Sequence, residues 1–219
     1  MGTDTYLPTV RTTPTRSRER ARYDAEFVHG VLDEAYVCHL GFVVDGAPRV
    51  LPTLHARVDR TLYLHGSTGS SPALGSSDGG LPVCVTVTLI DGLVYARSQF
   101  HHSANYRSVM AHGIARRVTD EAEKRVAFDA LVNKVGPGRA ADSRPPHAKE
   151  LAQTAVLALE LVEVSAKTRG HGVVDDPEDH SLPHWAGVVP LRLVPGAPEP
   201  DAGVAAPTPD YLPGRAPKC

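Results

Sequence analysis

The sequence predicts a mainly β (α+β) fold, a small antiparallel barrel of six or seven short strands with flanking helices. Apolar residues alternate in short runs that end at turn signals such as Asp45-Gly46. The strands do not alternate regularly with helices, as they would in a parallel sheet with crossover helices. No GxGxxG or GxxxxGK[ST] motif occurs anywhere in the chain. These observations favour a barrel over a Rossmann-type sheet.

The expected strands follow one another closely in the first half of the chain. Eight segments are candidates for the six or seven strands, namely residues 36–44, 49–57, 61–65, 82–90, 93–98, 109–118, 154–165 and 185–193. The pair at 82–90 and 93–98 is expected to form a hairpin about Asp91-Gly92. A loop rich in glycine and serine fills residues 66–80.

Two helices carry recognisable start signals. Asp24 can cap a helix over residues 24–35, in which Val28 and Leu32 recur at helical spacing. A second helix is expected over residues 119–135, where Thr119 begins a capping arrangement. A short helix is expected over residues 147–153.

Composition divides the chain into three parts. Residues 1–22 are rich in threonine, arginine and proline without periodicity, so they form an arm that is either disordered or wrapped over a partner subunit. The barrel domain is expected over residues 23–195. Residues 196–219 form a tail rich in proline and alanine, which should be largely irregular.

Charge and apolar content restrict the functional class. The 219 residues carry a formal net charge of −2, and arginines are dense only between Arg11 and Arg22, so no nucleic-acid partner is expected. No apolar run approaches the roughly 20 residues that span a bilayer, and no secretory signal is evident. We therefore expect a cytoplasmic protein, without a membrane partner, that acts on a small molecule. Cys38 and Cys84 lie in apolar strands and are expected to be buried thiols.

The segment QFHHSANYRSV, residues 99–109, is the densest group of polar side chains beside a predicted strand. Such groups are costly to bury without partners, so we interpret the segment as the wall of a wet pocket. His101 and His102 are candidate acid/base groups or donors to an anion. Adjacent side chains point apart on an extended segment, so no shared metal is expected. The alternative is a solvated turn.

Four other features could bind an anion or a flat ring. The loop from His65 can offer backbone N–H groups and hydroxyls to a phosphate, or it is an ordinary flexible loop. Arg107 can pair with a phosphate or carboxylate, or form a surface salt bridge. The basic cluster KTR at residues 167–169 can bind an anion or simply be solvated. Trp185 can stack on a ring or belong to the core.

Five segments resemble the pyridoxamine 5′-phosphate oxidase-like proteins, and more narrowly the branch with flavin-nucleotide-binding and nitroimidazole-resistance-type members. They are VLDEAYVCHLGFVVDGAPRVLPTLHAR, TLYLHGS, VCVTVTLIDGLVYARS, FHHSANYRSV and WAGVVPLRL, and the match spans about residues 16–195. The resemblance implies a split β-barrel, usually a homodimer with two cofactor sites at the interface.

The resemblance also implies where FMN would lie, namely across the second strand and the loop after the third. The corresponding residues are Arg49, Val50, Leu51, Pro52, Thr53, His65, Ser67, Thr68, Ser70 and Ser71. Asn105, Arg107 and Ser108 would face the same cleft, and Lys167 and Trp185 would approach it from the C-terminal part. The implied function is an FMN-binding oxidoreductase of unknown small substrate, with His101 and His102 as candidate catalytic residues.

The loop after the third strand departs from the family pattern. Relatives carry a basic residue there, whereas residues 70–74 read SSPAL. Losing one charge-assisted phosphate bond costs about 1.5–3 kcal/mol, or roughly one to two decades in affinity. Two alternatives therefore stay open. One is a haem-binding protein or haem enzyme, with His39, His65, His101 or His102 as ligand. The other is a non-enzymatic binding protein with a vacated cofactor pocket. Residues for a vitamin B6 substrate phosphate are not evident.

Overall fold

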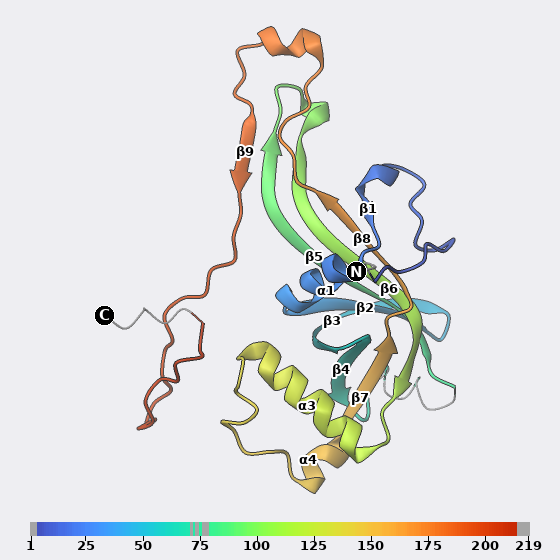
Figure 1. Cartoon of the computed structure of the whole chain (residues 1–219), viewed down its shortest axis with the longest axis vertical. Helices are drawn as coiled ribbons and strands as arrows, with labels where there is room; N and C mark the ends of the chain where they lie inside the picture. The colour runs from blue at the N-terminus through green and yellow to red at the C-terminus, as the bar shows by residue number, and fades with distance from the viewer. Residues whose placement is uncertain (1–3, 71, 73–74, 76–78, 214–219) are drawn as a thin grey trace.

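The computed structural model describes residues 4–70, 72, 75 and 79–213 (Figure 1). The strands are β1 (Ala21–Arg22), β2 (Val37–Val44), β3 (Ala47–Val58), β4 (Thr61–Ser67), β5 (Leu81–Tyr95), β6 (Ser103–Arg117), β7 (Thr154–Glu160), β8 (Glu163–Arg169) and β9 (Gly187–Pro190). The α-helices are α1 (Ala25–Glu34), α3 (Glu121–Val135) and α4 (Ala148–Gln153), and short 3-10 helices are η1 (Arg18–Arg20), η2 (Gln99–His101) and η3 (Pro177–Ser181).

All strand pairings are antiparallel, and the strand order is β1-β8-β6-β7-β4-β3-β2-β5-β9. Because β6 also pairs with β5, the strands β5, β6, β7, β4, β3 and β2 form a closed ring of six. This ring confirms the predicted mainly β fold of the split-barrel type, with helices at its flank.

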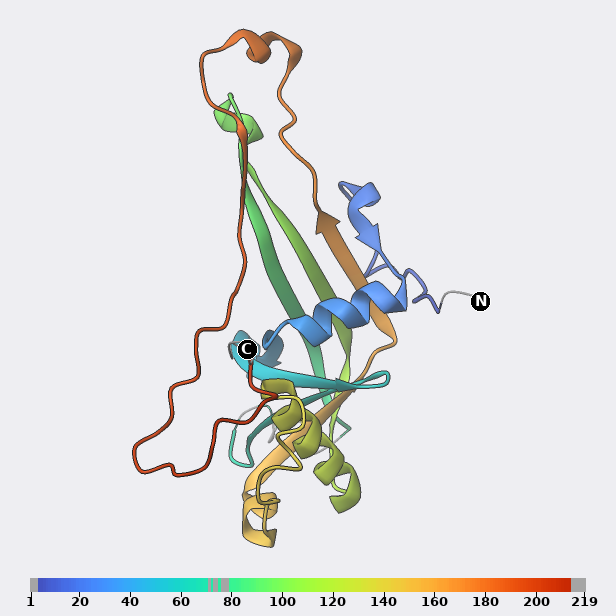
Figure 2. The same ribbon diagram turned by 60° about the vertical axis from the view of Figure 1, so that its left-hand side comes forward.

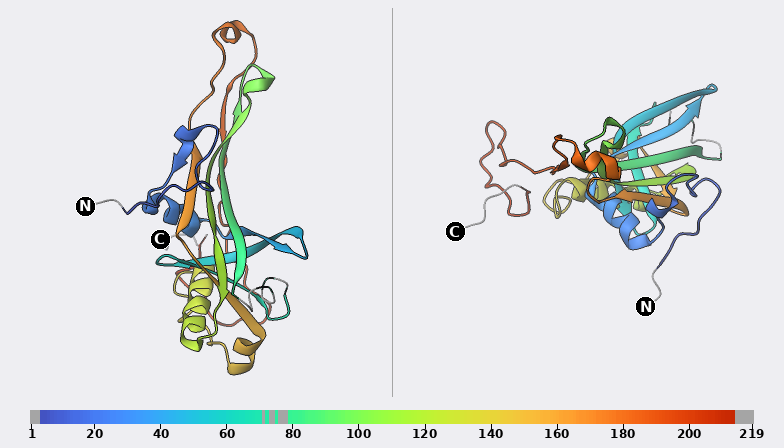
Figure 3. Two further views of the ribbon diagram at one scale, coloured as in Figure 1. Left: turned by 90° about the vertical axis from the view of Figure 1, so that its right-hand side faces the viewer. Right: turned by 90° about the horizontal axis from the view of Figure 1, so that it is seen from above.

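Strands β5 and β6 are 15 residues long, so their far halves project from the ring as a two-stranded ribbon. Its tip carries η2, and the chain after β8 runs along the ribbon, turns at η3 and returns through β9 (Figures 1 and 2). Seen from above, the C-terminal tail extends to one side of the ring, while the N-terminal arm lies on another (Figure 3).

Helix α1 supplies the centre of the core. Asp24 accepts a hydrogen bond from the backbone N–H of Phe27, as the capping prediction requires. Val28 and Leu32 are fully buried against inward-facing strand residues, among them Leu62. At the other end of α1, the Lys134 ammonium donates to the carbonyl of Leu32 at 2.8 Å, a favourable place for a cation. The helix is thus fixed at both ends and along its apolar face.

Three boundaries differ from those predicted. Asp91-Gly92 does not form a hairpin, because β5 continues through these residues with only a register shift between Ile90 and Gly92. An Asp-Gly pair is compatible with a β-bulge as well as with a hairpin turn. Strand β6 starts at Ser103, so most of the polar segment 99–109 is strand. The expected strand 154–165 is instead two strands, β7 and β8, with a break at Leu161. The sequence did not predict this break because the alternation of apolar residues continues across it.

The arm packs on its own chain over the described residues. Tyr6 is buried, and its hydroxyl lies 2.8 Å from Nε2 of His29. Thr9 and Arg11 both donate to the carboxylate of Glu163 on β8. The arm therefore covers the outer side of β8. Over the part of the chain that the structure describes, no helix has the length and apolarity needed to cross a membrane.

Replacing Leu62 by alanine tests the packing of the ring. Leu62 is completely buried in the core, so truncation should lower the free energy of unfolding by about 2–5 kcal/mol. Val126→Ala, at a 46% exposed position on α3, is the matched control and should cost less than about 1 kcal/mol. Equal losses in urea unfolding would contradict this core.

Candidate functional site

The N-terminal half of β3 presents two faces. Side chains alternate along a strand, so Arg49, Leu51 and Thr53 share one face, and Val50 and Pro52 lie on the other. A cavity of about 60 Å³ opens beside the first face, and we call it the β3–β4 cleft. It is lined by Leu40, Leu51, Thr53, Leu64, His65, Gly66, Ser70, Pro72, Ala155 and Leu157. The structure thus brings together Leu51, Thr53, His65 and Ser70.

The loop after β4 brings Ser70 to this cleft. The carbonyl of Ser67 accepts the N–H of Ser70 at 3.0 Å, and the hydroxyl of Ser67 accepts the N–H of Gly69 at 3.3 Å. The N–H of Thr68 donates to the carbonyl of Gln153, which ties the loop to α4. Ser71, also expected at this site, lies outside the described residues.

The described lining of the cleft contains no lysine or arginine. Arg49 lies on the same face of β3 as Leu51, is exposed, and has no ion pair with any described residue. It is therefore the cation that this strand can offer to an anionic group beside the cleft.

Two of the candidate histidines have no hydrogen bond to the part of the chain that the structure describes. His65 is exposed at the cleft. His39 is exposed on the opposite face of the sheet. Val37, Val50 and Leu54 lie on the same face of β2 and β3, and more than a third of the surface of each is exposed. Both imidazoles are thus free to bind a ligand.

Arg107 is held by two carboxylates. Its Nε and Nη2 donate to Asp91 at 3.0 and 2.7 Å, and Nη1 and Nη2 donate to Glu34, the latter at 2.8 Å. These bonds raise the pKa of Arg107, and the guanidinium lowers the pKa of Glu34. The salt-bridge alternative therefore describes Arg107, which does not present a free guanidinium to a phosphate. Glu34 was missed as a partner because only the fold places it beside β6.

The triad of Glu34, Asp91 and Arg107 lines a cavity of about 770 Å³. Tyr36 and the segment 190–194 form other parts of its wall, and the N–H of Leu191 donates to the carbonyl of Asp91. The triad has a net charge of −1, and Arg192 in the same lining brings the net charge of the lining residues to zero.

His101 and His102 lie at the tip of the ribbon, far from the β3–β4 cleft (Figure 2). Nε2 of His101 is 3.1 Å from a carboxylate oxygen of Asp176, and Nδ1 of His102 is 3.0 Å from the carbonyl of Ser98. The ring of Tyr95 contacts both His102 and Trp185, with centroid separations of 5.9 Å. Within one chain the tip residues do not join the cleft, because β5 continues straight through Asp91-Gly92.

Ser108 and Lys167 are register partners on the outer face of β6 and β8, and Asn105 lies near the start of β6. The hydroxyl of Ser108 donates to the carbonyl of Lys167 at 3.3 Å. Asn105 accepts a hydrogen bond from Arg169, and only 5% of the surface of Arg169 is exposed. The sequence placed Arg169 in a basic cluster but did not reveal its burial.

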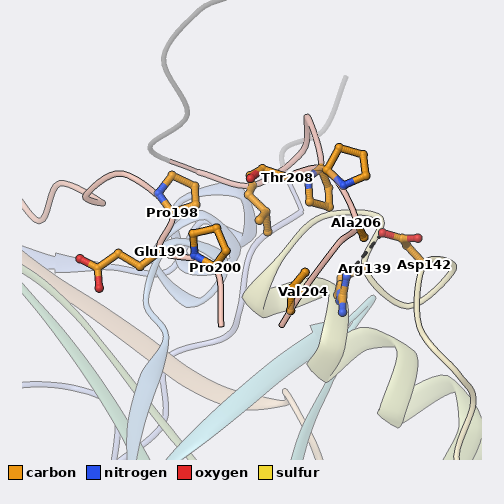
Figure 4. A pocket seen from close by; sticks show the side chains of 11 residues that line it. Arg139, Asp142, Pro198, Glu199, Pro200, Val204, Ala206 and Thr208 are labelled. Atoms are coloured by element: carbon orange, nitrogen blue, oxygen red, sulfur yellow. Dashed lines mark hydrogen bonds and ion pairs between the residues drawn. The ribbon is translucent and has the colours of Figure 1, made fainter. Parts of the chain in front are cut away.

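A further cavity, of about 600 Å³, lies between the C-terminal tail and the loop after α3 (Figure 4). The hydroxyl of Tyr211 donates to Asp142 at 2.5 Å and accepts from Arg139 at 3.1 Å, which fixes the tail to the loop. The rest of the lining is mainly prolines and small apolar residues of the tail, and it includes none of the sequence-predicted site residues.

The antiparallel ring, with the β3–β4 cleft beside it, is the architecture of a split-barrel protein. A family model described as pyridoxamine 5′-phosphate oxidase matches residues 24–168. The chain belongs to this family, which confirms the resemblance seen in the sequence. No curated protein sequence matches the chain.

Solved structures extend the comparison beyond the family core. The flavocytochrome Anf3 from Azotobacter vinelandii is 38% identical, with a TM-score of 0.87 over 94% of this chain and 97% of that one. A FAD and heme binding protein from Mycobacterium smegmatis is also 38% identical, with a TM-score of 0.82 over 89% and 98%. A protein from Bacteroides thetaiotaomicron, described as a 5-nitroimidazole antibiotic resistance protein, is 23% identical, with a TM-score of 0.57 over 66% and 83%.

Replacing Arg107 by glutamine tests the two-carboxylate clamp. The pKa of Glu34 should rise toward its ordinary value, because the hydrogen bond from Arg107 is the main cause of its depression. A group with a depressed folded-state pKa stabilises the fold above its unfolded pKa. The stability gap between wild type and variant should therefore be widest above about pH 4.3 and narrow as the pH falls further.

The measurements are a side-chain carboxyl NMR titration and urea unfolding as a function of pH. Arg125→Gln, which removes a surface pair with Glu121, is the control and should leave Glu34 unchanged. A Glu34 titration that is identical in Arg107→Gln and wild type would refute the clamp.

Proposed function

We propose that this protein is a flavin- and haem-binding redox protein, an oxidoreductase that acts as a homodimer on a small molecule. The observation that carries the proposal is the extent of the match. The family model ends at residue 168, whereas the two proteins named for flavin and haem match this chain over 94% and 89% of its length. The likeness therefore reaches beyond the family core into the arm or the segment after β8.

The β3–β4 cleft is the proposed flavin site. Arg49 offers a guanidinium, and Ser67 and Ser70 offer hydroxyls, a donor set that suits a phosphate. Arg49 would supply the positive charge that the loop lacks. The cavity of about 60 Å³ is too small for a whole flavin, so a second subunit would complete the site. The proposal covers FMN, which the sequence favours, and FAD, which is named for one of the neighbours.

The proposed haem ligand is His39 or His65. Of the four candidate histidines, His101 and His102 already have hydrogen-bond partners, whereas the other two have none among the described residues. His39 lies among exposed apolar side chains, which suit a porphyrin, and His65 lies beside the cleft. Bound flavin exchanges electrons singly or in pairs and haem iron exchanges them singly, while the protein binds and orients both groups.

The homodimer is supported by exposed apolar side chains on the outer face of the ring. Contiguous apolar surface of this kind commonly marks an interface, and a twofold dimer is the commonest arrangement that covers it. The side chains are Val37, Val43, Val50, Leu54, Met110 and Ile114.

The absorbance spectrum of the purified protein tests the proposal. Flavin bands and a Soret band are expected, and release of the flavin followed by chromatography distinguishes FMN from FAD. Arg49→Gln should weaken flavin binding about 10- to 100-fold, because one charge-assisted phosphate bond is lost. Arg125→Gln is the matched surface control. A colourless protein that takes up neither flavin nor haem would refute the proposal and favour a non-enzymatic binding protein.

Single alanine variants identify the haem ligand. Either His39→Ala or His65→Ala should abolish the Soret band, since an axial imidazole is lost. His101→Ala and His102→Ala serve as controls and should retain it. Loss of the band only in one of these tip variants would show that the ligand has been assigned to the wrong part of the molecule.

A further inference from the structure

Strand β5 has an open stretch along one edge, between its two partners on that side. It pairs with β2 from Val83 to Thr86 and with β9 from Gly92 to Tyr95. Residues 87–90 lie between these pairings and have no strand partner on that edge among the described residues. An edge of this kind presents backbone N–H and C=O groups from alternate residues. The stretch can therefore offer hydrogen bonds to a ligand.

The cavity of about 770 Å³ lies at this open stretch and has apolar side chains on its walls. Tyr36 and Ile90 are 41% and 47% exposed. The chain after β9 runs past the C-terminal end of α1 and contributes Leu193 and Val194, which are 86% and 74% exposed (Figures 1 and 2). A cavity of this size suits a small organic molecule, and the exposed apolar side chains favour one with an apolar body.

The acidic part of the lining has capacity for a positively charged group. Glu34 and Asp91 both bind Arg107, and two carboxylates around one guanidinium leave one negative charge in excess. Each carboxylate has further lone pairs beyond those that Arg107 uses. The side chains of Glu34 and Asp91 are 54% and 36% exposed. An ammonium group can therefore reach their oxygens and donate to them.

The basic part of the lining is Arg192, on the segment after β9. It has no ion pair or hydrogen bond to the part of the chain that the structure describes. The fold thus leaves its guanidinium free for a carboxylate, the group that its planar donors suit best. Thr88, on the open stretch of β5, likewise has a hydroxyl without a hydrogen bond to a described residue. The two walls of the cavity therefore carry opposite charges.

We propose that this cavity binds a small zwitterion, a free molecule with an ammonium group, an apolar body and a carboxylate. Glu34 and Asp91 accept from the ammonium, Arg192 donates to the carboxylate, and the exposed apolar side chains contact the body. The charges of the lining sum to zero, so charge complementarity favours a ligand with both charges over a simple amine or acid. No residue lines both this cavity and the β3–β4 cleft, and the site does not depend on the flavin and haem proposed there.

Isothermal titration calorimetry of the purified full chain tests the site with three probes of matched length, ε-aminohexanoate, hexylamine and hexanoate. The zwitterion should bind most tightly. Each singly charged probe lacks one charge-assisted hydrogen bond and should bind about 10- to 100-fold more weakly. Absence of binding by ε-aminohexanoate, or equal affinity for all three probes, would overturn the proposal.

Variants at Arg192 separate the two ends of the ligand. Arg192→Gln should weaken ε-aminohexanoate binding about tenfold or more and leave hexylamine binding unchanged, because only the contact with the carboxylate is lost. Arg192→Glu should reverse the preference, so that hexylamine binds more tightly than ε-aminohexanoate. Arg125→Gln is the matched control and should keep the wild-type affinities.

Arg192 has no described partner, so its variants should keep the wild-type Tm, which separates binding from folding. Unchanged affinity of Arg192→Gln for ε-aminohexanoate would overturn the proposal. Competitive displacement of ε-aminohexanoate by FMN would also overturn it, because the cavity would then belong to the flavin.

Discussion

The pairing of β6 with three other strands is the constraint on which the molecule depends. This strand pairs with β5 along nearly its whole length, with β8 from Tyr106 to His112, and with β7 at Arg116 and Arg117. Gly113 lies where β6 passes from one partner to the next, and a Cβ there would come within 2.7 Å of Leu159. The close approach allows the ring to close, and ring closure in turn fixes both the β3–β4 cleft and the outer side of β8 that the arm covers.

The charged residues fall into two groups with different consequences. Arg107 is saturated by Glu34 and Asp91, which pins the end of α1 to the ribbon. Arg49 and Lys167 have no carboxylate partner among the described residues; Arg49 lies on the strand face beside the β3–β4 cleft, and Lys167 lies on the outer face of β8. Paired cations here stabilise the fold, whereas unpaired ones are available to anionic ligands.

Much of the fold could be predicted from the sequence because its signals are local. Asp24 and the apolar spacing after it gave α1, and short alternating runs gave β2, β3 and β4 close to their observed bounds. The grouping of Leu51, Thr53, His65 and Ser70 followed from the family resemblance, and the structure places these residues at one cavity.

The remaining features depend on contacts that no local pattern encodes. Arg107 meets Glu34 from 73 residues away, and Asp91 was interpreted as a turn residue although it lies in a continuous strand. The same error misplaced His101 and His102, because a hairpin at Asp91 would have kept them near the ring, whereas the long ribbon carries them to its tip. The burial of Arg169 arises only when β8 pairs with β6.

A crystal structure of the protein with the proposed flavin bound tests the central claim most directly. We expect the flavin phosphate within hydrogen-bond distance of Arg49 and the Ser70 hydroxyl, with Arg107 still bound to Glu34 and Asp91. A flavin phosphate bound to Arg107, with Arg49 in solvent and the two carboxylates displaced, would contradict the assignment of Arg107 to the fold and of Arg49 to the ligand.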